Sequence, residues 1–341
     1  MSAFIRALER IAEETRVLGP GAIAHTRLGR LPVPGGPGEG GSADRLEPFL
    51  TTVLYLHYHA RDRRGLAEAL SGGAARTAEL WRGEDPGFAE KVIAAVAGEG
   101  YLVEGFAAAA VDGEHADLAG HGLRLRAHRS DLRWRGRPRA GGEAAVRFPP
   151  YRRYLQRGRL LVVGDACTGG PRPEDVVRCY LRPAAEAAAG LTAELTGRLN
   201  ALGARFQLKL ASHPDGYERT DAAVAYVPVA EWDRARGAVA EVCERFAGEL
   251  SGEPPCLALR MRPGWAVAVD RARPGSPSFG RGRSALVARG LAAAWRSGAR
   301  TPADRLQSVL AELRAAGVDP HRPYLAPGLD PPALPDPGEA G

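Results

Sequence analysis

Residues 204–227, ARFQLKLASHPDGYERTDAAVAYV, contain a short segment of alternating side chains, then turn residues, then a second strand-like segment. In residues 204–210 the apolar side chains alternate strictly with three polar ones, Arg205, Gln207 and Lys209. Because successive side chains of a strand point to opposite faces of its sheet, this alternation predicts a strand with one apolar and one polar face. A Pro-Asp-Gly sequence favours a turn after it, and residues 219–227 return as a second strand. We therefore expect a β-hairpin.

Four other segments predict strands, and two of them, residues 176–182 and 256–262, show the same two-sided pattern. Strands are expected at residues 160–163, 176–182, 256–262 and 265–269. On the polar side of these strands lie Arg178, Tyr180, Arg182, Arg260 and Arg262. If the strands join the hairpin in one sheet, its apolar face packs on helices and its other face carries many cations.

The remaining periodic segments predict helices, which are expected at residues 3–18, 44–61, 65–70, 75–81, 86–97, 184–202, 229–250, 278–295 and 302–316. Segment 32–42 is rich in Gly and Pro and is expected to be a loop, and segment 134–143 to be a connection at a domain boundary. The expected fold class is α+β, with a mixed or antiparallel sheet that has one helix-packed face, preceded by a mainly helical N-terminal region. The expected parts are the mainly helical region 1–143, an α+β core at 144–300, and a C-terminal helix with a proline-rich tail at 301–341.

Lysine is rare in this basic chain. Of the 46 basic residues among 341, only Lys91 and Lys209 are lysines, and the net charge is +6. Arginine can supply a solvated positive charge, but it cannot release a proton, because guanidinium stays charged at any relevant pH. A lysine that persists in such a chain is a candidate general base. Lys91 fits an ordinary exposed helix face, so Lys209, on the polar face of the predicted hairpin, is the main candidate.

Several motifs resemble one known family. Arg205-Phe-Gln-Leu-Lys209, followed by Tyr217-Glu-Arg219-Thr-Asp221-Ala-Ala-Val-Ala-Tyr226-Val, resembles the core of the HopA-type effector family of plant-pathogenic bacteria. Further similarities, in the same order along the chain, are Tyr180-Leu-Arg182, Leu199-Asn200, Ser278-Phe-Gly280 with Arg283 and, more weakly, Tyr55-Leu-His57-Tyr58. The resemblance covers residues 151–295 and extends only loosely to the N-terminal third.

The resemblance implies an activity. Relatives of this effector family occur in bacterial peptide natural-product pathways, including those of class V lanthipeptides and thioamitides. There the family implies a phosphoserine/phosphothreonine lyase, which eliminates phosphate from a precursor peptide to leave dehydroalanine or dehydrobutyrine. A separate Ser/Thr kinase phosphorylates the peptide first. The chain itself has neither a Gly-rich phosphate loop followed by lysine nor an HRD/DFG pair, so we expect two partners, the phosphorylated precursor peptide and a separate kinase.

Elimination of phosphate needs a base and cations. We expect Lys209, desolvated among arginines, to remove the Cα proton. Cations must neutralise the phosphate and the developing oxyanion. The arginines expected to do so are Arg182, Arg219, Arg260 and Arg283, with Arg178 and Arg205 in reserve.

Other side chains have less defined roles. His213, His57 or His59 could protonate the leaving phosphate, although each alone fits an ordinary surface or helix residue better. Tyr226 could bind phosphate or carbonyl, or could be a cross-strand aromatic, and Asp221 is expected to orient an arginine.

Two functions of other kinds stay open. The same scaffold could be a non-catalytic phosphopeptide-binding or effector-like interaction protein that partners a kinase. More weakly, it could position a leader peptide within a kinase complex. Replacing Lys209 by Arg separates charge from basicity, since only the lyase needs a group that gives up its proton.

Composition argues against other classes of function. The four cysteines include no CxxC pair, and His57-Tyr-His59 has no neighbouring carboxylate in sequence, so we expect no metal and no cofactor. The arginine-rich residues 124–139 contain a single tryptophan, which is a poor stacking platform, so we expect no nucleic-acid partner. No apolar run reaches the length of a membrane span and residues 1–14 lack the apolar core of a signal peptide, so we expect no membrane partner and a cytoplasmic location.

Overall fold

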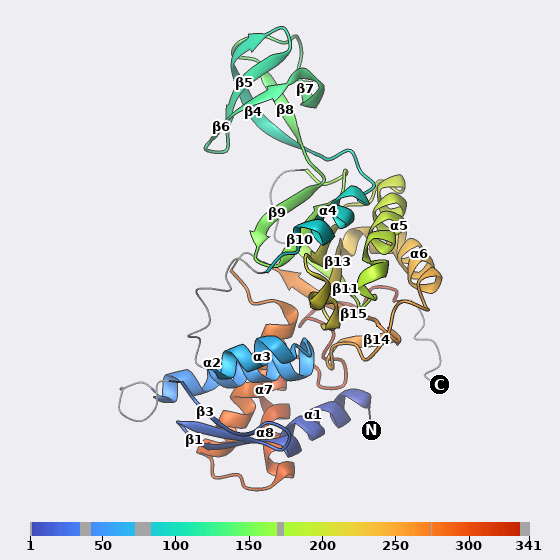
Figure 1. Cartoon of the computed structure of the whole chain (residues 1–341). Helices are drawn as coiled ribbons and strands as arrows, with labels where there is room; N and C mark the ends of the chain where they lie inside the picture. Colours follow the sequence, from blue (N-terminus) through green and yellow to red (C-terminus); the bar gives the residue numbers. More distant parts are fainter. Residues whose placement is uncertain (1, 35–41, 72–82, 169–173, 274, 335–341) are drawn as a thin grey trace.

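The centre of the protein is a large antiparallel sheet. The computed structural model describes residues 2–34, 42–71, 83–168, 174–273 and 275–334 (Figure 1). Within these residues the strand order of the central sheet is β14-β15-β11-β13-β12-β10-β9, and every neighbouring pair is antiparallel. Its strands are β9 (Tyr151–Gln156), β10 (Arg159–Val163), β11 (Glu174–Leu181), β12 (Gln207–Ala211), β13 (Ala223–Pro228), β14 (Leu259–Arg262) and β15 (Trp265–Ala272).

The predicted hairpin is present as β12 and β13. Lys209 lies opposite Val224, and Gln207 lies opposite Tyr226. The turn between the strands contains a short 3-10 helix, η5 (Pro214–Glu218), in which Pro214 occupies the first position, where its missing N–H costs nothing. The alternation therefore predicted the two faces of β12, and the turn residues predicted its pairing with β13. The strands begin at Gln207 and Ala223, later than the expected residues 204 and 219.

The apolar face of the central sheet packs on helices. Those helices are α4 (Pro86–Ala94), α5 (Ala188–Ala201), with the 3-10 turn η4 (Ala185–Ala187) before it, and α6 (Val229–Arg245) (Figure 1). Their core includes Phe206, Leu208, Val177 and Trp232, all fully buried or nearly so. Burial of this apolar surface is the main favourable contribution to the fold of this half.

The opposite face of the sheet is covered at its centre. Tyr180, Val224, Ala266 and Ala268 belong to a second core that also contains Phe279 of α7. The elements of this second half are α1 (Ala3–Glu14), β1 (Thr15–Gly19), β2 (Ala22–His25), β3 (Gly29–Pro32), α2 (Ser42–Leu54), the π-helix η1 (Tyr55–His59), α3 (Arg63–Leu70), α7 (Phe279–Arg296) and α8 (Pro302–Ala315). The polar sheet face is therefore partly a core rather than an open cationic surface.

A second sheet projects from the rest of the molecule (Figure 1). Its strand order is β6-β5-β4-β8-β7, and it has a small core of its own around Phe106, Leu118 and Val146. The strands are β4 (Tyr101–Asp112), β5 (His115–Gly120), β6 (Leu123–His128), β7 (Leu132–Trp134) and β8 (Glu143–Phe148), with the 3-10 turn η3 (Arg129–Asp131) before β7. The predicted connection at residues 134–143 thus joins two neighbouring strands of this sheet.

The α+β class is confirmed, and some boundaries differ from the prediction. The first helix was expected to reach residue 18, but it ends at Glu14 because Thr15 begins β1 and alternation replaces the helical pattern. The strands β1–β9 were not predicted, although the N-terminal region does contain the expected helices. The helix predicted at residues 75–81 lies outside the described residues.

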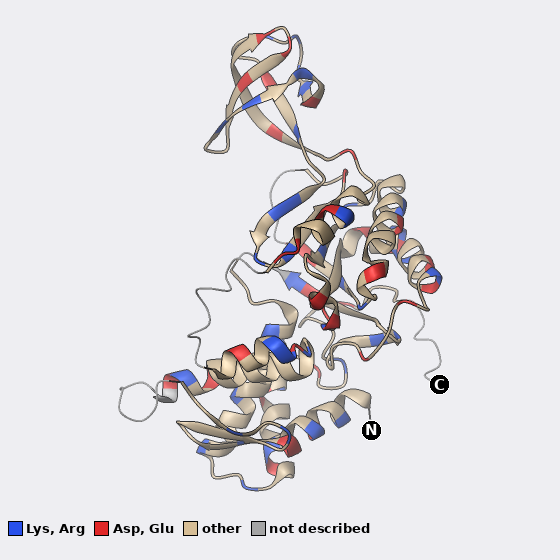
Figure 2. Cartoon of the chain, in the orientation of Figure 1, with Lys and Arg blue, Asp and Glu red and all other residues tan. Residues whose placement is uncertain are grey.

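The charged groups are mixed over the molecule. In the view of Figure 2, basic and acidic segments alternate across all three parts of the ribbon. Among the described helices, we find none with the length and apolarity that crossing a bilayer requires.

Candidate active site and the adjoining cavities

Lys209 lies on the polar face of the central sheet. Its half-buried side chain extends from β12, with Nζ 6.0 Å from the ring centre of Tyr226 on β13. The same ring has the Arg178 guanidinium 5.1 Å from its centre. Within the described part of the chain Lys209 makes no ion pair or side-chain hydrogen bond. Its amine is therefore not held by a carboxylate.

A buried carboxylate, Asp221, organises the cations beside this lysine. Arg219 donates from Nε to Oδ1 at 2.7 Å and from Nη2 to Oδ2 at 3.0 Å, and the Tyr55 hydroxyl donates to Oδ2 at 3.0 Å. Arg159 donates to Oδ1 at 3.3 Å. Burial alone would raise the pKa of Asp221, but the charges of Arg219 and Arg159 outweigh it and hold the pKa well below its usual range. Asp221 is thus a permanent anion that orients arginines.

His59 covers this cluster. Its ring is 4% exposed, stacks on Tyr55 at 5.4 Å and meets the edge of Tyr180 at 5.5 Å. Gly280 of α7 lies against the ring, and a Cβ at that position would overlap it. Burial lowers the pKa of His59 to about 4, with Asp221 opposing and the charges of Arg219, Arg178 and Lys209 adding to the decrease. His59 is therefore neutral at physiological pH.

A second buried ion pair lies on the same sheet face. Arg178, which is 8% exposed, contacts Asp270 of β15 through Nη2 and Oδ2 at 2.7 Å. Its Nε has no hydrogen-bond partner among the described residues. Burial would lower the pKa of Arg178, but the nearby Tyr180, Tyr226 and Asp270 raise it above its usual value. The guanidinium is a fixed charge beside Tyr226.

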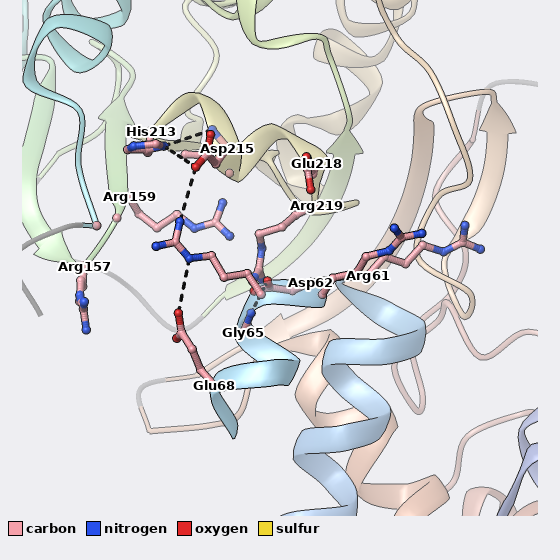
Figure 3. Close-up of a pocket in the computed structure, with 16 residues that line it drawn as sticks. Arg61, Asp62, Gly65, Glu68, Arg157, Arg159, His213, Asp215, Glu218 and Arg219 are labelled. Atoms are coloured by element: carbon pink, nitrogen blue, oxygen red, sulfur yellow. Dashed lines mark hydrogen bonds and ion pairs between the residues drawn. The ribbon is translucent and has the colours of Figure 1, made fainter. Parts of the chain in front are cut away.

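A cavity of about 400 Å³ lies on one side of this cluster, and Figure 3 shows residues that line it. His213, Asp215, Arg159, Arg157 and Arg219 are among the residues that line it. His213 caps η5, its Nδ1 accepting from the backbone N–H of Asp215 at 3.2 Å. Arg219 reaches from Asp221 to Asp62, the N-cap residue of α3, and so links the cavity wall to the buried carboxylate.

A larger cavity of about 960 Å³ adjoins the first, and the two share Arg61, Asp62, Arg63 and Glu218. The other residues that line it are one carboxylate, Glu14, and a mixture of cationic, apolar and aromatic side chains. The latter are Arg10, Arg27, Arg182, Leu28, Leu56, Leu66, Ala67, Leu70, His57 and Tyr58. The two cavities together form a continuous cleft along α3 and the end of η1.

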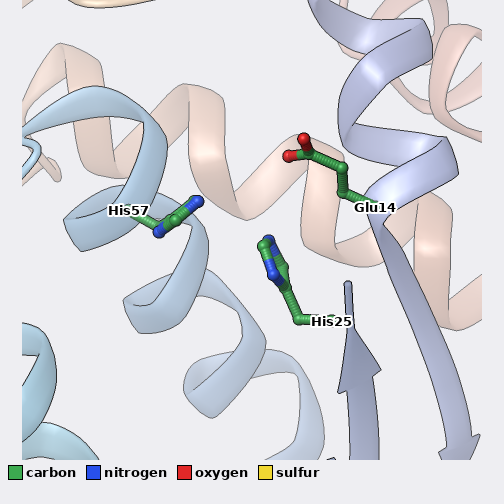
Figure 4. Close-up of side chains that lie close together, drawn as sticks. All are labelled: Glu14, His25 and His57. Carbon is green, nitrogen blue, oxygen red and sulfur yellow. The ribbon is translucent and has the colours of Figure 1, made fainter. Parts of the chain in front are cut away.

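Two histidines and a carboxylate meet at the rim of the larger cavity (Figure 4). His25 lies 2.9 Å from the Tyr58 hydroxyl, which donates to Glu14 Oε2 at 2.6 Å, and Arg27 pairs with Glu14 at 3.2 Å. One ligand atom from each of Glu14, His25 and His57 lies within 4.8 Å of the others. Burial lowers the pKa of both histidines, that of His57 to about 4. Glu14 is already satisfied by Tyr58 and Arg27, so the cluster is held together without an ion.

The structure brings only some of the predicted residues together. It gathers four of them around His59 and Asp221, namely Lys209, Tyr226, Arg178 and Arg219. Arg182 lines the larger cavity. His57 and His213 line the two cavities rather than contacting Lys209.

Three predicted phosphate ligands have other partners. Arg283 is buried and donates to the backbone carbonyls of Pro323 and Leu325 at 2.7 and 2.8 Å. Arg205 pairs with Glu174 and Glu231, each at 3.1 Å, and Arg260 pairs with Glu253 at 3.4 Å. Each of the three guanidinium groups therefore has partners within the protein.

Other residues of the cluster were not predicted from the sequence. Tyr55 and Asp62 reach Asp221 and Arg219 from more than 150 positions away along the chain. The weak similarity of Tyr55-Leu-His57-Tyr58 to the effector family was the one signal that pointed to this segment. Arg159 and Asp270 carry no such signal, because nothing in a strand sequence shows which neighbouring strand it will meet.

Comparison with known proteins places this site within a family. Residues 151–325 match the model of the HopA1 effector protein family. The chain belongs to this family. The matched segment contains the whole central sheet, including Lys209, Asp221 and Tyr226, while Tyr55, His59 and Asp62 come from the chain before it.

Two solved structures are similar to this chain. They are an effector protein from Pseudomonas syringae pv. tomato strain DC3000, with 19% identity and a TM-score of 0.37, and one from Pseudomonas syringae pv. syringae strain 61, with 20% identity and a TM-score of 0.36. Each comparison covers 50% of this chain and 63% of the effector, so this chain spans less than two thirds of either effector. No curated protein matches the chain.

Proposed function

We propose that this protein is a phosphoserine/phosphothreonine lyase that eliminates phosphate from a precursor peptide. The observation that carries the proposal is the environment of Lys209. Its half-buried amine lies against Tyr226 and near Asp221, Arg219 and Arg178, without an ion-pair partner among the described residues. Membership in the HopA1 effector family supports it, since the family resemblance implies this chemistry.

The proposed step is a β-elimination. The neutral amine of Lys209 takes the proton from Cα of the phosphorylated residue, and the electron pair of that C–H bond becomes the Cα–Cβ double bond. The Cβ–O bond breaks, and phosphate leaves with its electron pair. Dehydroalanine or dehydrobutyrine remains, and Lys209 is left as an ammonium that must lose its proton before the next cycle.

The surrounding charges fit this step because they are already fixed. Arg219 and Arg178 are held by Asp221 and Asp270, so little reorganisation accompanies the appearance of negative charge on the substrate. Arg178 and Lys209 both lie over the ring of Tyr226, and we propose that its hydroxyl donates a hydrogen bond to a carbonyl or phosphate oxygen. We propose no role in proton transfer for His59, which is buried and neutral.

The setting of the reaction is part of the proposal. We infer that the substrate is a peptide phosphorylated by a separate Ser/Thr kinase, in the biosynthesis of a lanthipeptide or thioamitide. The support is the family resemblance together with the absence of kinase signatures from the sequence.

The test is a mass measurement on synthetic phosphoserine and phosphothreonine peptides. The wild-type protein is expected to remove one phosphoric acid per phosphorylated residue. Lys209→Ala should slow this loss by about 100-fold or more, the usual contribution of a general base. Lys91→Arg is the matched control, since Lys91 is exposed on α4 and is the other lysine of the chain, and it should keep full activity.

Two results would sink the proposal. One is an unchanged rate in folded Lys209→Ala protein. The other is binding of phosphopeptide by the wild-type protein without any loss of mass, which would favour the phosphopeptide-binding alternative.

A further inference from the structure

More arginines than carboxylates line the larger cavity. Five arginines and three carboxylates line it. Glu14 is paired with Arg27, and Asp62 is paired with Arg219, so two of the carboxylates are already engaged. Glu218, the third, is exposed. Arg10, Arg61 and Arg182 make no ion pair or side-chain hydrogen bond with any residue that the structure describes.

Arg61 is the most constrained of these three. It has a φ of 50°, in the left-handed region that side-chain-bearing residues seldom adopt, and it is half-buried. Burial lowers its pKa, and the charges of Arg10 and Arg182 add to the decrease, while Glu253 and Cys256 oppose it. All three guanidinium-bearing residues line the same cavity. Like charges gathered in a partly desolvated site repel one another unless an anion joins them.

Local backbone contacts fix Arg61 in this position. The N–H groups on either side of it, those of Ala60 and Asp62, donate to the carbonyls of Tyr55 and Leu56, the first two residues of η1. The carbonyl of Ala60 accepts from Thr220 N at 3.0 Å, next to Asp221. These hydrogen bonds fix the backbone of Arg61 in its strained conformation. Backbone strain that the surrounding structure maintains in this way is typical of binding sites.

We infer that Arg10, Arg61 and Arg182 form a binding site for a phosphate monoester, separate from the reacting group at Lys209. A guanidinium group can donate two parallel hydrogen bonds to the oxygens of a phosphate. Three such groups without a protein partner suit a ligand with two negative charges better than a ligand with one carboxylate. A metal ion does not suit the cavity, because Arg10 and Arg27 would repel it.

The cavity is too large for phosphate alone. Leu28, Leu56, Leu66 and Leu70 line the rest of its volume of about 960 Å³, which suits the organic part of a ligand. Lys209 is not among the lining residues, and the Asp62–Arg219–Asp221 chain of contacts connects the cavity to the lysine cluster. In a peptide substrate, the bound ester would therefore be a second phosphorylated residue, not the one eliminated.

Calorimetric titration of the full chain with inorganic phosphate at low ionic strength tests the site. The wild-type protein should bind phosphate. Arg61→Gln and Arg182→Gln should each weaken binding by about tenfold, which is the effect of losing one charge-assisted interaction. Arg289→Gln is the control, because it removes the same charge from an exposed position of α7, paired with Glu312.

A second arm separates the sources of the phosphate. Titration of Lys209→Ala with singly and doubly phosphorylated peptides should show a gain of about tenfold for the second phosphate, and Arg61→Gln should remove that gain. Binding of inorganic phosphate without such a gain would assign the site to the free anion.

The inference is overturned if inorganic phosphate does not bind, or if Arg61→Gln and Arg182→Gln bind it as tightly as the wild type. Thermal unfolding without phosphate checks that both variants are folded. Phosphate binding without any elimination would count against the proposed lyase activity alone and leave this site intact.

Discussion

Arg61 should limit stability in the absence of a ligand. Its left-handed backbone costs an L-residue about 1 kcal/mol that glycine would not incur. Arg61→Gly is therefore expected to leave the free energy of unfolding unchanged or to raise it by up to about 1 kcal/mol, while phosphate binding is lost. Urea unfolding measures the first effect and calorimetry the second. A marked loss of stability would show that Arg61 serves the fold instead.

The buried histidine predicts how stability depends on pH. The pKa of His59 is about 4 in the folded protein and about 6.5 in the unfolded chain, so between these values the unfolded state binds more protons. Stability should therefore decrease as pH falls through this window, and His59 alone should account for about 2 kcal/mol between pH 7 and 5.

Urea unfolding at the two pH values measures this effect. In His59→Gln the difference between pH 7 and pH 5 should shrink by about that amount. His25 and His57 also have lowered pKa values, so part of the dependence should remain. An unchanged difference in His59→Gln would contradict the account of this residue.

At the residue scale, the sequence pointed to Lys209 through its rarity and through the alternation around it. It also suggested that Asp221 orients an arginine, and Arg219 contacts it as that interpretation requires. The sequence could not show that Arg283 binds the carbonyls of Pro323 and Leu325. An arginine on a helix gives the same sequence pattern whether it binds backbone carbonyls or a phosphate.

Helix α7 depends on glycine where it meets the site. A Cβ on Gly280 would overlap the His59 ring, whereas one on Gly282 would have only Pro277 nearby, at 3.9 Å. Gly280→Ala is expected to destabilise the fold by about 1–3 kcal/mol through overpacking and to disturb the cluster beneath His59.

Gly282→Ala, in the same helix, is the matched control. It should be neutral or stabilise the protein by up to about 1 kcal/mol, since alanine favours helix. Thermal unfolding and phosphopeptide turnover of both variants give the comparison. Equal behaviour of the two variants would contradict the packing argument.

At the element scale, strongly periodic segments were predicted well. The hairpin β12–β13 and the helices α5 to α8 lie where alternation and helical spacing placed them. The strands β1 and β4 were missed. In β4, exposed and buried positions do not alternate simply, because the register shifts between Val103 and Phe106. A bulge of this kind removes the period on which the prediction relies.

At the scale of the whole molecule, we expect the fold of the rest of the chain not to depend on the projecting sheet. Residues 101–148 have their own core and precede the family-matched segment. Leu102 and Arg147 are paired neighbours, so an Asn-Gly turn can close the chain between them. Replacing residues 103–146 in this way should leave cooperative unfolding and phosphopeptide turnover intact. Loss of the cooperative transition would show that the sheet supports the core.

At this scale the sequence predicted the α+β class but not which parts meet. Tyr55 and Asp62 join Asp221 and Arg219 only because η1 and α3 fold over the central sheet. Such long-range contacts depend on how helices pack on a sheet face, which periodicity does not encode. The cleft along α3 was invisible in the sequence for the same reason.

The central claim is that Lys209 acts as a base and not only as a charge. The most direct measurement compares wild-type and Lys209→Arg proteins for phosphopeptide binding and for loss of phosphoric acid. Arginine keeps the charge but cannot give up its proton, so Lys209→Arg should bind the peptide with similar affinity and show turnover reduced by about 100-fold or more. Turnover at the wild-type rate in Lys209→Arg would contradict the claim.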